Sequence, residues 1–167
     1  MRTINLPPYA PTLIESTRAI GYSLDTAIAD IIDNSITAQA SVVNIEFFPI
    51  GQPYISILDN GLGMTGDELN IAMQYGSKNP IEEREPDDLG RFGLGLKTAS
   101  LSQCRRLTVV SLKNGELSGR MWDIDYVLQT GEWSLIILEN DEIEQLPQYN
   151  ELIKNEKGTL VVCSIKD

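Results

Sequence analysis

Two pairs of strand-like runs, each joined by a short turn, constrain the fold of this chain more than any other feature. Apolar and β-branched residues fill 42–48 and 54–59, and the five residues PIGQP between them suit a hairpin loop. A second hairpin occupies 105–125, with Asn114-Gly115 as its turn. Two more strands are expected at 132–139 and 157–165. Because hairpin-connected strands pair antiparallel, the sequence predicts a largely antiparallel sheet.

Helical patterns alternate with these strands. Ser23 suits the N-cap of a helix over 23–40, whose expected buried stripe follows helical spacing: Leu24, Ala27, Ile28, Ile31 and Ile32. Further segments are assigned by composition: helices at 12–22, 66–75 and 96–104, an extended arm at 1–11 and an acidic, irregular segment at 139–156. The sequence therefore predicts an α+β fold, a two-layer sandwich with helices on one face of a mixed, mostly antiparallel sheet.

A glycine-rich stretch at 87–100 runs directly into one of these helices. It contains Gly90, Gly93 and Gly95, followed by Lys97. Glycine lets a backbone come close to a ligand, and the start of a helix presents unpaired N–H groups and a partial positive charge. Together with the charge of Lys97, this arrangement suits phosphate. A glycine-rich loop alone is a weak signal, so the rest of the chain must decide its meaning.

Composition excludes several classes of protein. A length of 167 residues suits one domain with a core of its own, and the net charge of −11 argues against a broad basic face that binds nucleic acid. Two cysteines and no histidine favour neither a disulfide framework nor a zinc site, so a reducing cytoplasm is expected. No apolar run is long enough to span a membrane, and the N-terminal residues lack the apolar core of a signal peptide.

Four short motifs occur in a fixed order along the chain: Asp30-x-x-x-Asn34, Asp59-x-Gly61-x-Gly63, Gly90-x-x-Gly93-x-Gly95-x-Lys97 and Gly158-Thr159. In this order and spacing the chain resembles the GHKL ATPases, which include DNA gyrase B, the ninety-kilodalton heat-shock chaperones, the histidine kinases, MutL and the MORC proteins. The resemblance covers roughly residues 20–165, and the motif residues are most similar to those of the MORC-like and chaperone-like members. It implies a Bergerat-type fold that binds ATP.

The resemblance also implies roles for individual residues. Asn34 would supply a side-chain oxygen to Mg²⁺, a hard cation that keeps several waters and needs few protein ligands. Asp59 would accept a hydrogen bond from the adenine amino group, and Thr159 would support Asp59 through its hydroxyl and a bound water. Gly61 and Gly63 would let the backbone approach the purine. The purine face would be covered by Met64.

Residues 76–97 match the ATP lid of the family. Its phosphate-binding end would hold the nucleotide through backbone N–H groups and adjoining side chains: Gly93, Leu94, Gly95, Leu96, Lys97 and Thr98. The acidic loop before it, 82–88, reads as solvated surface within this lid.

The departure from the family pattern lies at position 30. Hydrolysing members usually have Glu there, four residues before the magnesium Asn, where it polarises the attacking water. Asp30 is one methylene shorter, so its carboxylate sits about 1.5 Å further back. A misplacement of about 1 Å can cost on the order of a hundredfold in rate, so hydrolysis through Asp30 is expected to be slow. Asp33 is the alternative base, though it points about 60° away on the helix.

The function expected from these motifs is binding of Mg-ATP and slow hydrolysis to ADP and phosphate. Lid closure and ATP-dependent homodimerisation would make the domain a conformational switch, as in the family. Two alternatives remain open: a nucleotide-sensing module with negligible hydrolysis, and a histidine-kinase catalytic domain whose phosphoacceptor lies elsewhere. The chain is expected to be one domain, an N-terminal part of a longer protein whose target the sequence does not reveal. Any nucleic-acid contact would come from other domains, and no membrane contact is expected.

Overall fold

The computed structural model describes residues 3–19, 23–74 and 100–164. Its elements, in chain order, are α1 (Ala10–Ala19), α2 (Leu24–Thr37), β1 (Val43–Phe48), β2 (Tyr54–Asp59), α3 (Gly66–Met73), α4 (Ser100–Gln103), β3 (Arg106–Lys113), β4 (Glu116–Asp123), α5 (Ile124–Thr130), β5 (Ile136–Leu138), α6 (Asn140–Ile143), α7 (Tyr149–Asn155) and β6 (Gly158–Ser164). Both predicted hairpins are confirmed as the pairs β1–β2 and β3–β4.

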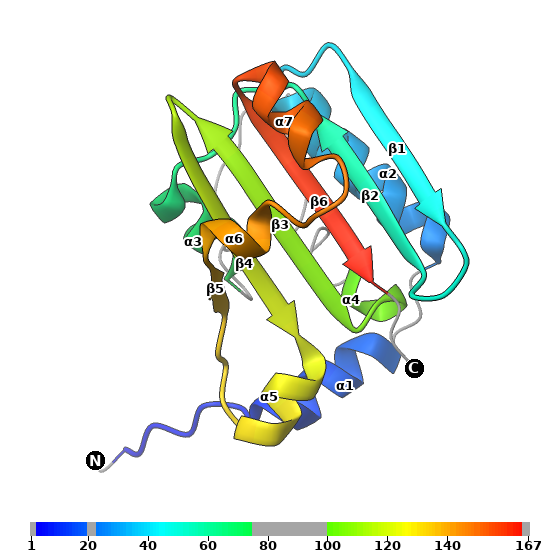
Figure 1. The fold of residues 1–167 in the computed structure, drawn as a ribbon. Helices are drawn as coiled ribbons and strands as arrows, with labels where there is room; N and C mark the ends of the chain where they lie inside the picture. The colour runs from blue at the N-terminus through cyan, green and yellow to red at the C-terminus, as the bar shows by residue number, and fades with distance from the viewer. Residues whose placement is uncertain (1–2, 20–22, 75–99, 165–167) are drawn as a thin grey trace.

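The six strands form one sheet in the order β1-β2-β6-β3-β4-β5, and each of the pairings between neighbours is antiparallel. The last strand of the chain, β6, therefore lies in the middle, between the two hairpins (Figure 1). This insertion sets Thr159 directly opposite Asp59 on one side and opposite Ser111 on the other. Three segments far apart in the sequence are thus brought to one end of the sheet.

Helices α1 to α5 cover one face of the sheet and build the larger core. Ile31 of α2 and Leu69 of α3 are buried there against residues of the central strands, such as Ile57 and Val109. Helix α3 is fixed at its start by a capping box between Thr65 and Glu68, which satisfies backbone N–H groups that the first turn leaves unpaired. The predicted α+β fold with a mostly antiparallel sheet is confirmed, but the expectation of helices on one face only is wrong, because α6 and α7 pack on the other face.

The acidic segment 139–156 was expected to be irregular, and this prediction was wrong. It contains α6 and α7, which pack on the opposite face of the sheet through Ile143 and Leu152 (Figure 1). Each helix is short and carries acids on its exposed side, so one or two buried apolar residues fix it by tertiary contact rather than by helix propensity.

The strand expected at 132–139 is shorter than predicted, since β5 covers only Ile136–Leu138. The ring of Trp133 packs edge-on against Trp122 of β4, with 6.1 Å between the ring centroids. Trp133 and Leu135 both contact the larger core, so the first half of this apolar run packs by its side chains and is not a strand.

The helix over 23–40 is confirmed as α2, with Ser23 at its N-cap. Its stripe is less uniform than predicted, because Leu24 at the exposed first turn remains 40% accessible. Residues 3–9 form neither helix nor strand and lie exposed, as expected for the arm, and α1 begins at Ala10. Among the residues that the structure describes, no helix is long and apolar enough to cross a membrane.

Candidate nucleotide site

Asp59, the last residue of β2, has a buried side chain that accepts three hydrogen bonds at the end of the sheet. It is 6% exposed, and its Oδ1 accepts hydrogen bonds from the backbone N–H groups of Gly61 (2.8 Å) and Thr159 (3.2 Å). Its Oδ2 accepts from the hydroxyl of Ser35 on α2 (2.9 Å). A carboxylate oxygen has two lone pairs, so Oδ2 keeps acceptor capacity for one more donor. A buried acceptor held in this way can select a ligand that brings a matching N–H group.

Thr159 contacts Asp59 through its backbone, and the contact expected through its hydroxyl and a bound water stays a prediction. Its backbone N–H donates directly to the carboxylate, while its hydroxyl lies 2.9 Å from the hydroxyl of Ser111 on β3. Ser111 Oγ in turn accepts from the backbone N–H of Met64 (2.8 Å) and lies 3.0 Å from the carbonyl oxygen of Gly158, to which it can donate. Ser111 therefore joins the turn after β2 to the start of β6.

The two glycines of the turn after β2 are required by the protein itself. A Cβ on Gly61 would lie 2.8 Å from the carbonyl oxygen of Ala38, just beyond α2. Gly63 has a φ of +69°, and a Cβ there would lie 2.2 Å from the carbonyl oxygen of Leu112. Both distances are shorter than atoms tolerate, so these positions admit glycine only. That the same backbone approaches a purine stays a prediction, and Met64, half-buried against the larger core, lies beside this turn.

Helix α2 carries the residues predicted to act on the phosphates. Asp30 and Asn34 are one turn apart on it, Asp30 half-buried and Asn34 exposed. Burial raises the pKa of Asp30 above its ordinary value, and the negative charge of Asp33 adds to the effect. Within the described ranges no hydrogen bond or ion pair reaches the carboxylate of Asp30. Because Ser35 on the same helix donates to Asp59, α2 is fixed relative to the sheet at this point.

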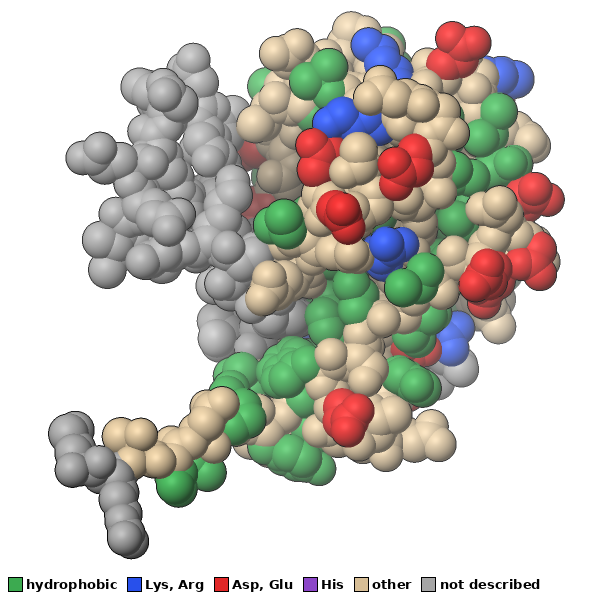
Figure 2. Space-filling view, turned by 90° about the vertical axis from the view of Figure 1, so that its left-hand side faces the viewer, with side chains coloured by type: hydrophobic (Ala, Val, Ile, Leu, Met, Phe, Trp, Pro, Cys, Tyr) green, Lys and Arg blue, Asp and Glu red, His purple; other side chains and the backbone are tan. Residues whose placement is uncertain are grey.

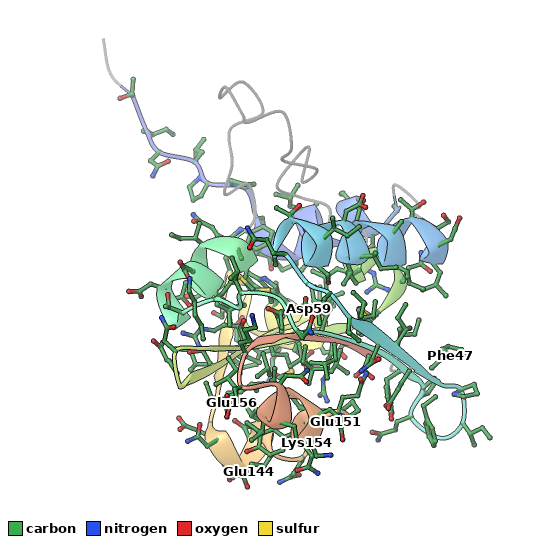
Figure 3. The ribbon with its side chains drawn as sticks, turned by 90° about the horizontal axis from the view of Figure 1, so that it is seen from above. Phe47, Asp59, Glu144, Glu151, Lys154 and Glu156 are labelled. Atoms are coloured by element: carbon green, nitrogen blue, oxygen red, sulfur yellow. The ribbon has the colours of Figure 1, made fainter. Side chains whose placement is uncertain are left out.

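The structure thus brings together most of the predicted residues at one end of the sheet, beside α2. Of these residues, Figure 3 labels Asp59, between this helix and the strands. This group comprises Asp30, Asn34, Asp59, Gly61, Gly63, Met64 and Thr159. The remaining predicted residues lie outside the described part of the chain: the lid at 76–97, with Gly93, Leu94, Gly95, Leu96 and Lys97, and also Thr98.

Two residues of this site were missed by the sequence reasoning, Ser35 and Ser111. Ser35 is four residues after Ile31, so it falls on the buried stripe of α2, where a hydroxyl needs a partner. Ser111 is likewise a buried polar residue between apolar residues of β3. A polar residue at an expected core position was the available signal in both cases.

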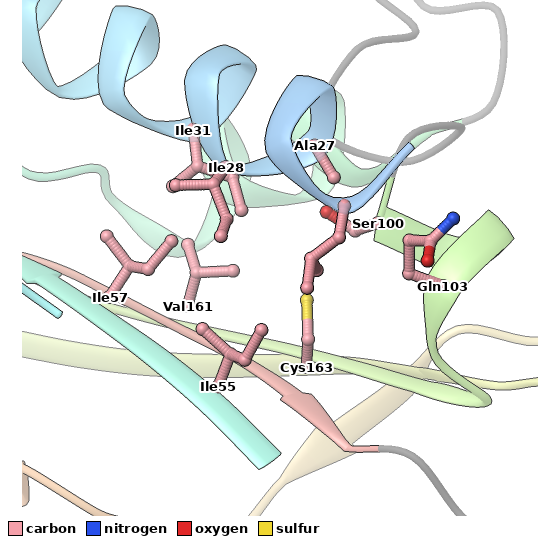
Figure 4. Close-up of a pocket in the computed structure, with 10 residues that line it drawn as sticks. Ala27, Ile28, Ile31, Ile55, Ile57, Ser100, Gln103, Val161 and Cys163 are labelled. Carbon is pink, nitrogen blue, oxygen red and sulfur yellow. The ribbon is translucent and has the colours of Figure 1, made fainter. Parts of the chain in front are cut away.

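A small cavity lies further along α2, between this helix and the sheet (Figure 4). Its volume is about 10 Å³, and aliphatic side chains such as Ile28, Ile55 and Val161 line it together with Ser100 and Cys163. A space of this size holds at most one water molecule. It is a packing defect of the larger core, and Asp59 is not among its lining residues.

The acids of 139–156 lie away from the candidate site. Figure 3 shows Glu144, Glu151 and Glu156 on the side of the sheet opposite α2, whereas Asp59 lies between α2 and the strands. On the face drawn in Figure 2, Lys and Arg side chains are scattered singly among acidic and neutral ones. The described charges on this face form no continuous basic surface.

Comparison with known proteins gives the family. Residues 22–159 match the model of the histidine kinase-, DNA gyrase B- and HSP90-like ATPases, a span that contains all four motifs. The chain is 32% identical over 91 residues to the ATPase morc-1 of Caenorhabditis elegans, which covers 54% of this chain and 10% of that protein. It is 30% identical over 108 residues to the DNA mismatch repair protein MutL of Coxiella burnetii, covering 63% of this chain and 19% of MutL.

The MutL protein of Thermosipho melanesiensis is 26% identical over 98 residues, which is 58% of this chain and 18% of MutL. The chain therefore spans less than a fifth of the length of these relatives. The sheet with β6 inserted between its hairpins, the residues at its end and the matched span together show that this chain belongs to the histidine kinase-, DNA gyrase B- and HSP90-like family of ATPases.

Proposed function

We propose that this domain binds ATP with Mg²⁺ and hydrolyses it slowly to ADP and phosphate. The observation that carries the proposal is the carboxylate of Asp59, which is buried and held by three donors, while none of the described residues uses the second lone pair of Oδ2. In this orientation Asp59 accepts the exocyclic amino group of adenine. A purine with a carbonyl oxygen at that position would present acceptor against acceptor and bind poorly.

The chain's own groups fit a magnesium ion bound to the phosphates. Asn34 offers a neutral amide oxygen, a hard donor of the kind that Mg²⁺ prefers, and it is exposed on the helix that Ser35 fixes to Asp59. When bound, Mg²⁺ would neutralise charge on the phosphate oxygens. The fixed helix holds Asn34 and Asp30 at a constant distance from the adenine-binding end.

Asp30 is the proposed base that orients the attacking water. Its raised pKa makes the ionised carboxylate a stronger proton acceptor than that of an ordinary Asp. Its side chain is shorter than the Glu of hydrolysing relatives, so we expect slow turnover. The same observation favours a second candidate function, a nucleotide-sensing module in which ATP occupancy is the signal and hydrolysis is negligible.

The switch itself is proposed from the family: closure of the lid at 76–97 over the phosphates, through the segment from Gly93 to Thr98, and nucleotide-dependent homodimerisation. The relatives named here are an ATPase and DNA mismatch repair proteins, and the chain matches only 10% and 18% of their lengths. Action within a larger protein is therefore part of the proposal. A reducing cytoplasm agrees with two cysteines that are free in the structure.

The test is calorimetric titration of Mg-ATP and Mg-GTP into the wild-type protein and two variants. Asp59→Asn replaces the acceptor of adenine by a donor or an already occupied oxygen, and we expect ATP affinity to fall by about a hundredfold or more. Asn34→Ala should remove the dependence of binding on Mg²⁺ while leaving the adenine contact. Equal affinity for ATP and GTP, or unchanged binding by Asp59→Asn, would contradict the proposal.

Single-turnover hydrolysis then separates the two candidate functions. Wild-type turnover above the uncatalysed rate, lost in Asp30→Ala with ATP binding retained, supports the slow ATPase. Binding without turnover in the full-length protein supports the nucleotide sensor. Turnover that persists in Asp30→Ala would remove Asp30 from its proposed role.

A further inference from the structure

The two edges of the sheet differ in a way that points to an interaction surface. At one edge, β5 is only three residues long. At the other, β1 is six residues long and contains neither proline nor lysine (Figure 1). Proteins usually protect such an edge with a short strand, proline or lysine, because its unpaired backbone groups invite another strand. The β1 edge has none of these protections before Pro49.

The backbone of β1 determines which residues present their hydrogen-bonding groups at this edge. The carbonyl oxygen of Val42 accepts from the N–H of Asn60, so these two residues are a hydrogen-bonded pair in register with the β1–β2 ladder. Hydrogen-bonded and non-bonded pairs alternate along an antiparallel ladder. The N–H and C=O groups of Val43, Ile45 and Phe47 therefore point away from β2, toward the free edge.

The side chains of β1 are unusually apolar for an exposed strand. Ile45 is 47% and Phe47 60% exposed, on the face that α2 covers. Figure 3 shows Phe47 at the outer limit of the molecule. On the opposite face Phe48 stacks against Tyr54 of β2, with ring centroids 5.4 Å apart. Stacking fixes this ring in place while leaving about half of it accessible.

The sequence of this strand is self-complementary about Ile45. Reading outward in both directions gives polar, apolar and apolar residues on each side: Asn44, Val43 and Val42 before Ile45, and Glu46, Phe47 and Phe48 after it. We propose that β1 pairs antiparallel with β1 of a second copy of this chain, with Ile45 on the two-fold axis. The two sheets then continue as one, joined at their β1 edges.

This register pairs the backbone hydrogen-bonding groups at the edge and gives the charge of Glu46 a partner. Ile45 pairs with its own copy and Val43 with Phe47, which are the residues whose backbone groups face the edge. Each Glu46 lies opposite an Asn44 amide, which can donate to its carboxylate, so the one charge on the strand gains a donor rather than a second charge. Cross-strand pairs of this kind stabilise antiparallel sheets.

The neighbouring registers are less favourable. An axis through Glu46 would set two carboxylates directly opposite each other, which destabilises a sheet. An axis through Asn44 would place Glu46 opposite Val42 and leave Phe48 without a partner. A single strand pair buries less than the roughly 1,600 Å² of a standard interface, so the dimer depends on protein concentration. It needs no nucleotide, which separates it from the ATP-dependent association proposed above.

Cysteine cross-linking tests this register. Asn44→Cys and Glu46→Cys are made separately and oxidised mildly, alone and as an equimolar mixture without nucleotide. In the proposed register the thiol introduced at position 44 of one copy faces the thiol introduced at position 46 of the other. The mixture should therefore form about ten times more disulfide dimer than either variant alone, because like positions are offset by two residues, beyond the roughly 7 Å across which two Cα atoms can be bridged. Mass spectrometry identifies the linkage between positions 44 and 46.

Sedimentation velocity at increasing concentration provides the second measurement. Ile45→Lys should weaken the wild-type dimer by about a hundredfold, because it places two unpaired charges at the axis. Ile36→Lys, an equally exposed isoleucine on α2, is the matched control and should leave the dimer unchanged. A wild-type protein that stays monomeric, or equal cross-linking in the mixture and the single variants, would overturn the proposal. Either result would leave the edge to a different partner strand.

Discussion

Two aspartates, Asp30 on α2 and Asp59 at the end of β2, have opposite surroundings. Asp59 is buried and accepts three hydrogen bonds, from Ser35, Gly61 and Thr159. Asp30 is half-buried, receives no hydrogen bond from the described residues, and has its pKa raised by burial and by Asp33. Charged acceptors with several donors are stable and rigid, whereas a partly desolvated carboxylate beside another acid is neither.

The difference indicates which part of the function the fold builds in. The strand order places Asp59, Thr159 and Ser111 side by side, so the proposed acceptor of adenine is positioned by the fold itself. Nothing comparable orients Asp30 among the described residues. In the proposed function, groups that order Asp30 come with the nucleotide or from parts of the protein outside the described residues, and this is why we expect slow hydrolysis.

The largest expected effect comes from breaking the framework around Asp59 without touching its carboxylate. Gly63→Ala forces a Cβ to within 2.2 Å of the Leu112 carbonyl oxygen at a φ of +69°, and we expect a loss of about 3 kcal/mol or more in the free energy of unfolding. Gly51→Ala is the matched control, since Gly51 also has a positive φ, +76°, but nothing lies within 4 Å of a Cβ there.

The control should lose only about 1 kcal/mol, the cost of the backbone conformation alone. Urea unfolding of both variants measures the difference. Equal losses would mean that the turn after β2 relaxes freely, and that Asp59 is less firmly held than its hydrogen bonds indicate.

A smaller effect is expected from removing one donor to Asp59. Ser35→Ala leaves Oδ2 without its hydroxyl partner, and a hydrogen bond to a charged group contributes about 1.5–3 kcal/mol. The control is Thr37→Ala on the same helix, with an expected change of about 0.5 kcal/mol or less. Among the described residues, the exposed hydroxyl of Thr37 bonds only the carbonyl oxygen of Asp33.

If α2 is positioned by Ser35, the variant should also bind Mg-ATP more weakly, whereas Thr37→Ala should not. Calorimetric titration next to urea unfolding separates the two effects. A Ser35→Ala protein that is destabilised but binds ATP normally would restrict Ser35 to a structural role.

These contacts also show where reasoning from the sequence ended. The hairpins, α2 with its N-cap and the candidate residues Asp30, Asn34, Asp59 and Thr159 follow from local patterns and from the order of the motifs. The bonds from Ser35 to Asp59 and from Ser111 to Thr159 join residues 24 and 48 positions apart. The first depends on how α2 packs on β2 and the second on β6 entering the sheet between β2 and β3, and no local pattern specifies either.

The prediction of irregular chain at 139–156 was wrong for a related reason. Its composition is dominated by acids, which predicted solvated, irregular chain, but Ile143 and Leu152 each cover part of the second face of the sheet. Two buried side chains in 18 residues give too weak a periodicity to indicate helices. Their partners on the sheet, such as Leu160 and Val162, are only brought beneath them by the completed strand order.

The smallest effect is expected at Asp30 and has the opposite sign. A carboxyl group whose pKa is raised by folding binds its proton more tightly in the folded protein, so ionising it opposes folding. Below the ordinary value of 3.8 the group is protonated in both states and makes no difference. As the pH rises above that value, the unfolded state loses its proton first. The free energy of unfolding of the wild-type protein therefore decreases until the group is ionised in the folded state as well.

Asp30→Asn removes this cost, so the variant should be slightly more stable than wild type at pH 7 and equal to it near pH 3. Asp25→Asn on the same helix is the control, because the hydrogen bond from Ser23 lowers the pKa of Asp25 and its ionisation favours folding. Urea unfolding of both variants is measured at pH 7 and near pH 3. At pH 7 the unfolding midpoint should rise above that of wild type for Asp30→Asn and fall below it for Asp25→Asn. If Asp30→Asn instead lost stability at pH 7, Asp30 would have a stabilising partner, and the contrast with Asp59 would fail.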